Sequence, residues 1–325
     1  MFMRRSVSAL VTAIITLSGE HLFAQNYPDR PIRVVDAYAP GGTSDVMGRL
    51  LGQKFQESQG QPWILENRTG GNGIIGSEYV AKTKADGYTL LMFTTTLTVQ
   101  PSLYRNLPYD VVKSFTPVIL AASNANVLVL HPAIPVKNVR DFIAVARAKT
   151  GQLTYASGGA GTSTHMSMEL FKSMAKLDVR HIPYKGITPG VMDIMGGHVD
   201  CAFSTMPVVL PHIKAGKLRA LAASSEKRAL ALPDLPTVAE SGLPGYSAVN
   251  SVGILAPTDT PADIVIKLNA SVAKILELPD IRERLAVIGM EPVGGNPEKF
   301  AAFIRTEIRK WAGVVKSSGM ELQGW

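Results

Sequence analysis

The stretch IRVVDAYAPGGTSDVMGRLLGQKFQESQ, residues 32–59, decides the fold class. Residues 32–38 have the apolar character of a buried strand, and residues 45–59 carry apolar side chains at helical spacing. A short glycine-rich loop joins the two. A strand, a short loop and a helix of this length form the repeating unit of α/β proteins.

The same rhythm continues along the chain and predicts an α/β fold with a mainly parallel sheet. Further strands are expected at residues 63–66, 89–94, 126–131, 154–156, 179–184, 201–204 and 220–223. Further helices are expected at residues 76–85, 139–148, 165–174, 191–196 and 210–215.

The length of 325 residues suits two lobes of roughly 100–150 residues each. Two similar apolar strands, 127–132 and 252–257, each end in proline and precede a helix. They could be paired crossover strands, which would divide the chain into residues 26–126 plus 248–325 and residues 127–247. Two unrelated core strands would give the same pattern, and the sequence leaves both open.

The first residues have the order of a secretory signal peptide. Arg4 and Arg5 precede an apolar stretch at 7–17, which is too short to span a bilayer, since a spanning helix needs about 20 residues. Cleavage after Ala24 is expected, and it changes the net charge from +7 to +6. We therefore expect a periplasmic protein. No later segment is apolar enough to span a membrane, and Cys201, the single cysteine, allows no internal disulfide.

Two loops rich in glycine and hydroxyl groups, at 39–45 and 155–165, are the candidate binding site. Each follows a strand and opens a helix, the position where α/β sheets bind ligands and where free N–H groups attract anions. Thr43, Ser44 or Asp45 is expected to cap the first helix. Ordinary strand-to-helix turns share this composition, but the occurrence of two such loops, one in each expected lobe, favours a binding role.

Other segments support weaker hypotheses. Lys185, next to Tyr184, could neutralise an anion, and Asp200 could accept a hydrogen bond from a ligand. Residues 71–76, GNGIIG, match a dinucleotide fingerprint, but the preceding strand and the expected acidic residue are misplaced, so no nucleotide cofactor is expected. No metal-binding spacing occurs, and no basic run interleaved with aromatic residues indicates nucleic-acid binding.

Several motifs together resemble the Bug-type (Bordetella uptake) receptors of tripartite tricarboxylate transporters. They cover almost the whole chain after residue 26, and they are YPDRPI (27–32), APGGTSD (39–45), ENR (66–68) with GNGIIG (71–76), DGYTL (86–90), LPYD (107–110), YASG (155–158) with Gly161-Thr162, PYKG (183–186) and GHVD (197–200).

The resemblance implies a two-lobed Venus-flytrap fold with two crossover strands, and a carboxylate ligand held between the loops 41–45 and 157–165. The ligand would be a di- or tricarboxylate, an acidic amino acid or an aromatic acid. The resemblance adds a ligand-facing loop at Thr94–Thr96 and makes residues 66–76 structural. Asp36, Tyr38 and Cys201 depart from the family pattern, so the ligand is not specified. Uptake through a membrane transporter and sensing both remain open.

We therefore predict a periplasmic carboxylate receptor that is not an enzyme and needs no cofactor or metal. The alternative is a periplasmic hydrolase that uses Ser157 or Ser163 on a small ester, although neither serine lies in G-x-S-x-G. A purely structural protein is a third hypothesis, which the two glycine-rich loops disfavour. The predicted ligand-binding residues are Tyr38, Pro40, Gly41, Gly42, Thr43, Ser44, Asp45, Thr95, Thr96, Ser157, Gly158, Gly159, Thr162, Ser163, Thr164, His165, Tyr184, Lys185 and Asp200.

Overall fold

The computed structural model describes residues 27–324 and has an α/β fold. The strands are β1 (Ile32–Asp36), β2 (Trp63–Asn67), β3 (Thr89–Thr94), β4 (Phe115–Leu130), β5 (Thr154–Ser157), β6 (Arg180–Pro183), β7 (Cys201–Thr205), β8 (Arg219–Ala223), β9 (Val249–Pro257) and β10 (Glu291–Pro292). The helices are α3 (Thr43–Gln59), η1 (Gly71–Gly73), α4 (Ile74–Ala81), α5 (Thr95–Leu103), α6 (Val139–Ala148), α7 (Ser163–Ala175), α8 (Ile187–Met195), α9 (Met206–Lys214), α10 (Ala262–Glu277), α11 (Pro279–Val287) and α12 (Pro297–Ser318).

The expected signal peptide, residues 1–24, lies outside the described residues. Within residues 27–324, no helix has the length and apolar character needed to cross a membrane.

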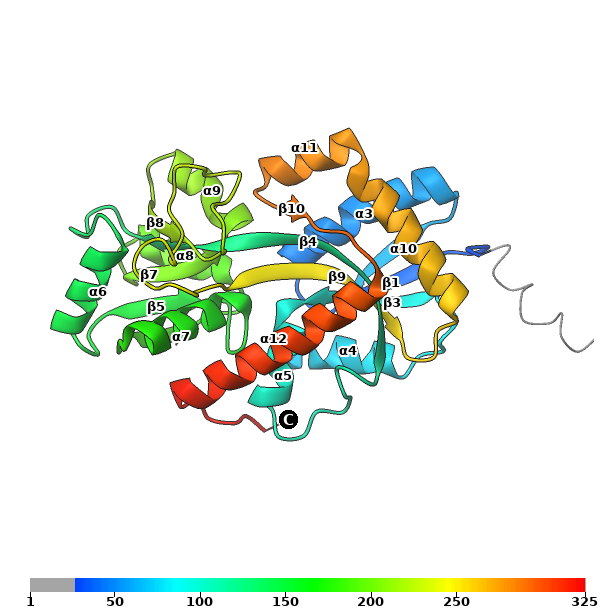
Figure 1. The fold of residues 1–325 in the computed structure, drawn as a ribbon, viewed down its shortest axis with the longest axis horizontal. Coiled ribbons are helices and arrows are strands. Elements are labelled where there is room, and N and C mark those ends of the chain that lie inside the picture. Colours follow the sequence, from blue (N-terminus) through cyan, green and yellow to red (C-terminus); the bar gives the residue numbers. More distant parts are fainter. Residues whose placement is uncertain (1–26, 325) are drawn as a thin grey trace, which may run out of the picture.

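The long strand β4 organises the sheet because it changes partners along its length. Residues 115–125 pair with β9, whereas residues 126–130 pair with β7 and residues 127–130 with β8 on the other edge. The resulting order is β2-β1-β3-β9-β4-β7-β5-β6, with β8 and β10 also paired to β4. Figure 1 shows β4 and β9 running side by side through the middle of the molecule.

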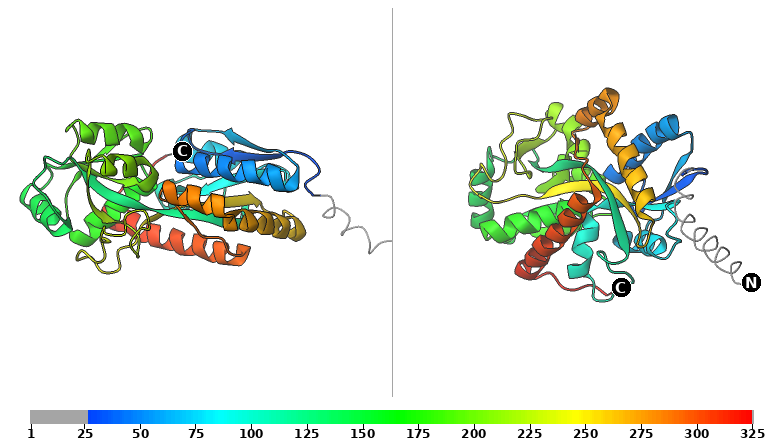
Figure 2. Two further views of the ribbon diagram at one scale, coloured as in Figure 1. Left: turned by 90° about the horizontal axis from the view of Figure 1, so that it is seen from above. Right: turned by 45° about the vertical axis from the view of Figure 1, so that its right-hand side comes forward.

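The helices gather in two groups around the ends of these crossing strands. Helices α6 to α9 surround β5, β7 and β8, while α3, α4, α10 and α11 surround β1, β3 and the start of β4 (Figures 1 and 2). We keep as a proposal the division into a first lobe, residues 26–126 plus 248–325, and a second lobe, residues 127–247. The names first lobe and second lobe are used below in this sense.

The hydrophobic core is shared between the lobes on one face of the sheet. One cluster of buried side chains includes Phe93 of the first lobe, Phe203 of the second lobe and Trp311 of α12. Helix α12 packs on α5 and on α7, where the hydroxyls of Ser173 and Ser317 lie 3.0 Å apart. On the other face each lobe has a cluster of its own. Helix α12 therefore connects the lobes in addition to the two strands.

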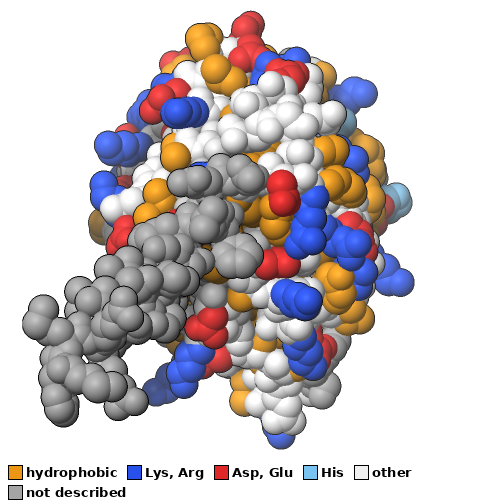
Figure 3. Space-filling view, turned by 90° about the vertical axis from the view of Figure 1, so that its right-hand side faces the viewer, with side chains coloured by type: hydrophobic (Ala, Val, Ile, Leu, Met, Phe, Trp, Pro, Cys, Tyr) orange, Lys and Arg blue, Asp and Glu red, His pale blue; other side chains and the backbone are white. Residues whose placement is uncertain are grey.

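Charges of both signs lie on the face at the end of the first lobe (Figure 3). There, Lys and Arg are interspersed with Asp, Glu and apolar side chains (Figure 3). Several of these charges pair across the fold, including Arg30 with Asp86 at 3.0 Å and Lys54 with Asp280 at 2.9 Å.

Two expectations about local structure are wrong. The sheet is mixed rather than mainly parallel, because the crossing strands β4 and β9 run antiparallel to each other and to their neighbours β3, β7 and β8. Thr95 and Thr96 do not lie in a loop but begin helix α5, whose threonine-rich sequence and internal Pro101 conceal a helical pattern.

Gly253 provides a test of how tightly the crossing strands pack. A Cβ added there would lie 2.6 Å from the Ile119 carbonyl oxygen, and neither backbone can move without disturbing the sheet. We expect Gly253→Ala to lower the free energy of unfolding by about 1–3 kcal/mol, the usual effect of overpacking.

Urea denaturation measures this effect, with Gly313→Ala as the matched control. Gly313 is exposed within α12, and an added Cβ meets no atom within 4 Å, so Ala should raise stability by up to about 1 kcal/mol. An equal effect of the two substitutions would contradict this account of the packing.

Candidate functional site

The loop between β1 and α3 is closed by backbone geometry and by one carboxylate. Gly42 is the N-cap of α3, and no side chain caps the first turn, so the expected cap by Thr43, Ser44 or Asp45 is wrong. Gly41 has a φ of +83°, which favours glycine, and its N–H donates to Asp45 Oδ2 at 3.0 Å. The first N–H groups of α3 are therefore left for a ligand or solvent.

Asp45 builds this loop rather than offering a free carboxylate. Its oxygens accept hydrogen bonds from Arg49 at 2.9 and 3.0 Å and from Asn67 at 3.1 Å, in addition to Gly41. Burial alone would raise the pKa of Asp45, but these hydrogen bonds outweigh it and lower the pKa. Asp45 is thus ionised and fully engaged by protein donors.

Asp36 also accepts hydrogen bonds from this loop, in its case from Ser44 and Tyr38. The Ser44 hydroxyl lies 2.9 Å from both oxygens of this fully buried carboxyl group, and Tyr38 N–H donates to it at 3.2 Å. Burial raises the pKa of Asp36 to about 7, although the Ser44 hydrogen bond partly offsets the effect. Among the hydroxyls of this loop, Thr43 is the one that makes no hydrogen bond to another described residue.

The second loop, between β5 and α7, is also braced from within. Thr162 is the N-cap of α7, and its hydroxyl donates to the Gly159 carbonyl at 2.7 Å. Gly158 N–H donates to the Thr164 hydroxyl at 2.9 Å, and Gly159 N–H donates to the Ser157 hydroxyl at 3.0 Å. The hydroxyl of Ser163, at the first position of α7, has no partner among the described residues.

His165 supports this loop with its imidazole ring. Its Nδ1 accepts from Gly161 N–H at 3.0 Å, so the neutral ring carries its proton on Nε2. The ring stacks on His181 at 4.2 Å, and His181 stacks on Tyr155 at 4.8 Å. His181 Nε2 lies 2.6 Å from the Ser157 hydroxyl. The stacked histidines therefore hold both ends of the stretch from Ser157 to Gly161, His181 through Ser157 and His165 through Gly161.

A buried carboxylate completes the stack. Glu169 accepts a hydrogen bond from the Tyr155 hydroxyl at 2.6 Å and forms an ion pair with Lys172 at 2.7 Å. Burial first, then the neighbouring His181 and Lys172, lowers the pKa of His165 to about 3. Burial likewise lowers the pKa of His181 to about 4. Both imidazoles are therefore neutral at neutral pH.

The segment after β3 contributes side chains that are already partly used. Thr95 accepts a hydrogen bond from Ser251 N–H at 2.9 Å and so ties α5 to β9. Tyr38 lies behind the first loop, where its hydroxyl faces the Asn72 carbonyl at 3.4 Å, and burial raises its pKa to about 12. Thr96 is buried.

Of the three remaining predicted residues, Asp200 lies apart from the two loops, whereas Tyr184 and Lys185 border the second loop. Tyr184 N–H donates to the Ser157 carbonyl at 3.0 Å, and Gly186 N–H donates to the Gly158 carbonyl at 3.3 Å. Asp200 precedes β7 and accepts two hydrogen bonds from Thr154 at 2.7 and 2.8 Å, so it lies at the end of the sheet opposite Ser157. The Tyr184 hydroxyl donates to Asp193 of α8 at 2.5 Å, and Lys185 is exposed. Asp200 lies far from the two loops, because it precedes β7 at the amino end of the strands, whereas the second loop follows the carboxyl end of β5.

Four buried polar atoms lie where the lobes join, and three of them, all except that of Thr94, belong to residues that the sequence analysis did not name. Thr94 Oγ1 at the end of β3, Ser204 Oγ near the end of β7, Asn126 Oδ1 of β4 and Ser251 Oγ of β9 have no hydrogen-bond partner among the described residues. An unsatisfied buried polar group costs about 1–3 kcal/mol, so a ligand or water is expected to bind them. The signal was present in the sequence as single polar residues inside apolar strands.

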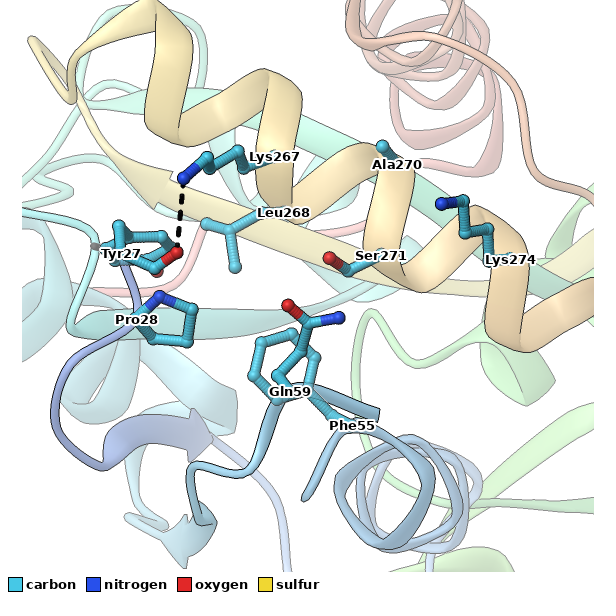
Figure 4. A pocket seen from close by; sticks show the side chains of 9 residues that line it. All are labelled: Tyr27, Pro28, Phe55, Gln59, Lys267, Leu268, Ala270, Ser271 and Lys274. Carbon is cyan, nitrogen blue, oxygen red and sulfur yellow. Dashed lines mark hydrogen bonds between the residues drawn. The ribbon is translucent and has the colours of Figure 1, made fainter. Parts of the chain in front are cut away.

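A cavity of about 230 Å³ lies elsewhere, between the start of the described chain, the end of α3 and α10. Lys267, Lys274, Tyr27 and Phe55 are among its lining residues, and the Lys267 ammonium donates to the Tyr27 carbonyl at 3.4 Å (Figure 4). None of the predicted site residues lines it. Within residues 27–324, no group of three His, Cys, Asp or Glu side chains is placed to hold a metal ion.

Known proteins resemble this chain over nearly its whole length. Residues 47–320 match the family model described as tripartite tricarboxylate transporter family receptor. Protein BugT of Bordetella pertussis is 38% identical over 302 residues, which cover 92% of this chain and 93% of that protein.

Solved structures agree with this match. The Rhodopseudomonas palustris protein Rpa4515 with adipate is 36% identical with a TM-score of 0.85, and it covers 92% of this chain and 100% of its own. MatC from Rhodopseudomonas palustris with bound malate is 31% identical with a TM-score of 0.81, covering 89% and 100%.

The histidine stack predicts how stability depends on pH. A histidine in the unfolded chain has a pKa of about 6.5, so below that pH the unfolded chain binds a proton that folded His165 does not accept. Stability is therefore lost as the pH falls from 6.5 towards 3, by about 2–3 kcal/mol at pH 4.5 for this residue.

His165→Asn removes this titration and keeps an acceptor near the position of Nδ1. Urea denaturation of both proteins between pH 7 and pH 4.5 should show a smaller loss of stability for the variant, by the same amount. If the stability of the wild type and of His165→Asn fell equally with pH, His165 would not be buried in its neutral form.

Proposed function

Because the chain belongs to the tripartite tricarboxylate transporter receptor family, we propose that it is exported by residues 1–24 and captures a small organic carboxylate in the periplasm. The resemblance drawn from the sequence motifs is confirmed by these matches. The protein is a periplasmic solute-binding receptor and not an enzyme. The captured acid is passed to a membrane transporter or reported to a sensor.

The observation that carries the proposal is a pair of helix N-termini, each preceded by a glycine-rich loop. The first turn of α3 has no side-chain cap, and α7 begins at Ser163, whose hydroxyl has no hydrogen-bond partner among the described residues. Helix N-termini attract anions through their free N–H groups and the helix dipole. A carboxylate at each end of a ligand, or one carboxylate shared between the loops, matches this arrangement.

The donors of the proposed site are neutral. Each charge-assisted hydrogen bond to a carboxylate contributes about 1.5–3 kcal/mol, and a partly buried helix N-terminus adds up to about 2 kcal/mol. A few such contacts, reduced by the cost of association, reach the roughly 8 kcal/mol of a micromolar complex. The buried polar atoms of Thr94, Ser204, Asn126 and Ser251 offer further contacts for a polar ligand or its bridging waters.

The hydrolase hypothesis named Ser157 or Ser163, and neither is arranged as a nucleophile. The Ser163 hydroxyl has no hydrogen bond to a histidine among the described residues. Ser157 does lie 2.6 Å from a histidine, but its side chain is fully buried and its hydroxyl accepts the Gly159 N–H. A nucleophile has to reach a substrate carbonyl, whereas this hydroxyl shapes the loop.

A panel of organic acids tests the receptor proposal directly. Thermal unfolding of the protein purified from the periplasm should shift upward with at least one of adipate, malate, citrate, glutamate or benzoate. A ligand at 100 times its Kd stabilises the folded protein by about 2.7 kcal/mol. Native mass spectrometry of the same preparation identifies any acid that is copurified. No shift across the panel and no copurified acid would contradict the proposal.

Thr43→Val tests the first loop without disturbing it. The Thr43 hydroxyl makes no hydrogen bond to a described residue, so an isosteric Val should leave the melting temperature of the ligand-free protein nearly unchanged. Losing one hydrogen bond to a carboxylate should weaken binding by about tenfold or more, as measured by calorimetry. Thr258→Val, an exposed site at the far end of β9, is the control and should bind as the wild type does.

A further inference from the structure

The motif at residues 70–73, just before α4, forms an unusual turn. Gly70, Gly71, Asn72 and Gly73 have φ values of +129°, +54°, +53° and +90°. Glycine adopts these conformations freely, and Asn is among the few other residues that tolerate the left-handed region. The turn therefore has one side chain, that of Asn72, and its flanking glycines allow close approach on both sides.

The Asn72 side chain crosses from the first lobe to the second. Its Nδ2 donates to the Ala160 carbonyl at 2.8 Å, a contact between residues 88 positions apart. The Asn72 carbonyl is held from behind by Gln100 Nε2 at 3.0 Å, and the Gln100 oxygen accepts from the Tyr109 hydroxyl at 2.6 Å. Hydrogen bonds within the first lobe therefore fix the backbone of Asn72 and so position its side-chain amide.

The contact surface around this hydrogen bond is close-packed. Gly161 has a φ of +75°, and a Cβ added there would lie 2.7 Å from Leu103 Cδ2 and 3.3 Å from Asn72 Nδ2. Ala160 and Gly161 belong to the second glycine-rich loop, whose Gly161 N–H is bound by His165. Both lobes therefore meet at the second glycine-rich loop, where the ligand is proposed to bind. This contact does not involve the hydroxyls of Thr43 and Ser163.

We propose that Asn72 is a latch that stabilises the approach of the lobes and, through Ala160, fixes the second glycine-rich loop around the ligand. The part of this proposal that concerns ligand release rests on the proposed receptor function. The part that concerns lobe closure does not, because the hydrogen bond joins two protein groups. Helix α12 also bridges the lobes, through α5 and α7, so the latch adds to an existing connection.

Asn72→Gly is the appropriate variant, because it keeps the positive φ and deletes only the amide. Spin labels at Ile64→Cys in β2 and Met192→Cys in α8 report the distance between the lobes, since both sites are exposed and the native Cys201 is buried. Without added ligand, the population of molecules with separated lobes should be about fivefold larger in Asn72→Gly than in the wild type. A factor of about five is the usual effect of one hydrogen bond.

The dissociation rate of adipate or malate should rise by a similar factor of about five in the unlabelled variant. Asn72→Asp, which places a carboxylate against the Ala160 carbonyl, should have the larger effect on both measurements. Asn138→Ala is the control: it removes the amide that caps α6 within the second lobe, and it should change neither the distance distribution nor the dissociation rate.

Unchanged distance distributions in both Asn72 variants would overturn the latch, even if ligand binding is found. If the wild type binds no acid, the receptor proposal fails separately, and the distance measurement alone decides the latch.

Discussion

The rest of the structure depends on the continuous pairing of β4, which is almost entirely buried from Phe115 to Leu130. A strand interior to a sheet must satisfy its N–H and C=O groups along its whole length. Here β9 pairs with one edge of β4 up to Ala125, β10 pairs with the other edge at Ala122 and Ser123, and β7 and β8 flank the strand beyond Ala125. The exchange of partners between Ala125 and Asn126 places the carboxyl ends of β3 and β7 beside the junction of the lobes. Thr94 and Ser204, which lie near these carboxyl ends, are two of the residues whose buried polar atoms have no described partner.

The loops of the candidate site show a division of labour between side chain and backbone. Four polar side chains form hydrogen bonds within the protein that fix the conformation of the loops: those of Asp36, Asp45, Thr162 and His165. What remains for a ligand is mostly backbone N–H, together with the hydroxyls of Thr43 and Ser163. A site of this kind needs no arginine, because the oriented peptide groups supply the positive potential.

The strand and helix positions of residues 27–94 could be predicted because their periodicity is strong and their turns contain glycine. The beginning of β4 could not, because Pro117 and the polar Ser123, Asn124 and Asn126 interrupt its apolar pattern. Both glycine-rich loops could be located, and their backbone role follows from composition. The roles of Asp45, His165 and Asp200 could not, because each depends on a hydrogen-bond partner that is chosen by the tertiary fold.

The order of strands has a consequence for how the chain is made. Strand β9 lies between β3 and β4, although it follows them by more than 100 residues, so the first lobe cannot complete its sheet until Pro257 has emerged. Pairing of such distant segments is slow, and until then β3 and β4 expose unpaired edges. The second lobe, by contrast, is one uninterrupted segment. With the proposed division into lobes, a nascent chain can complete the second lobe before the first, whose N-terminal strands wait for β9 to arrive.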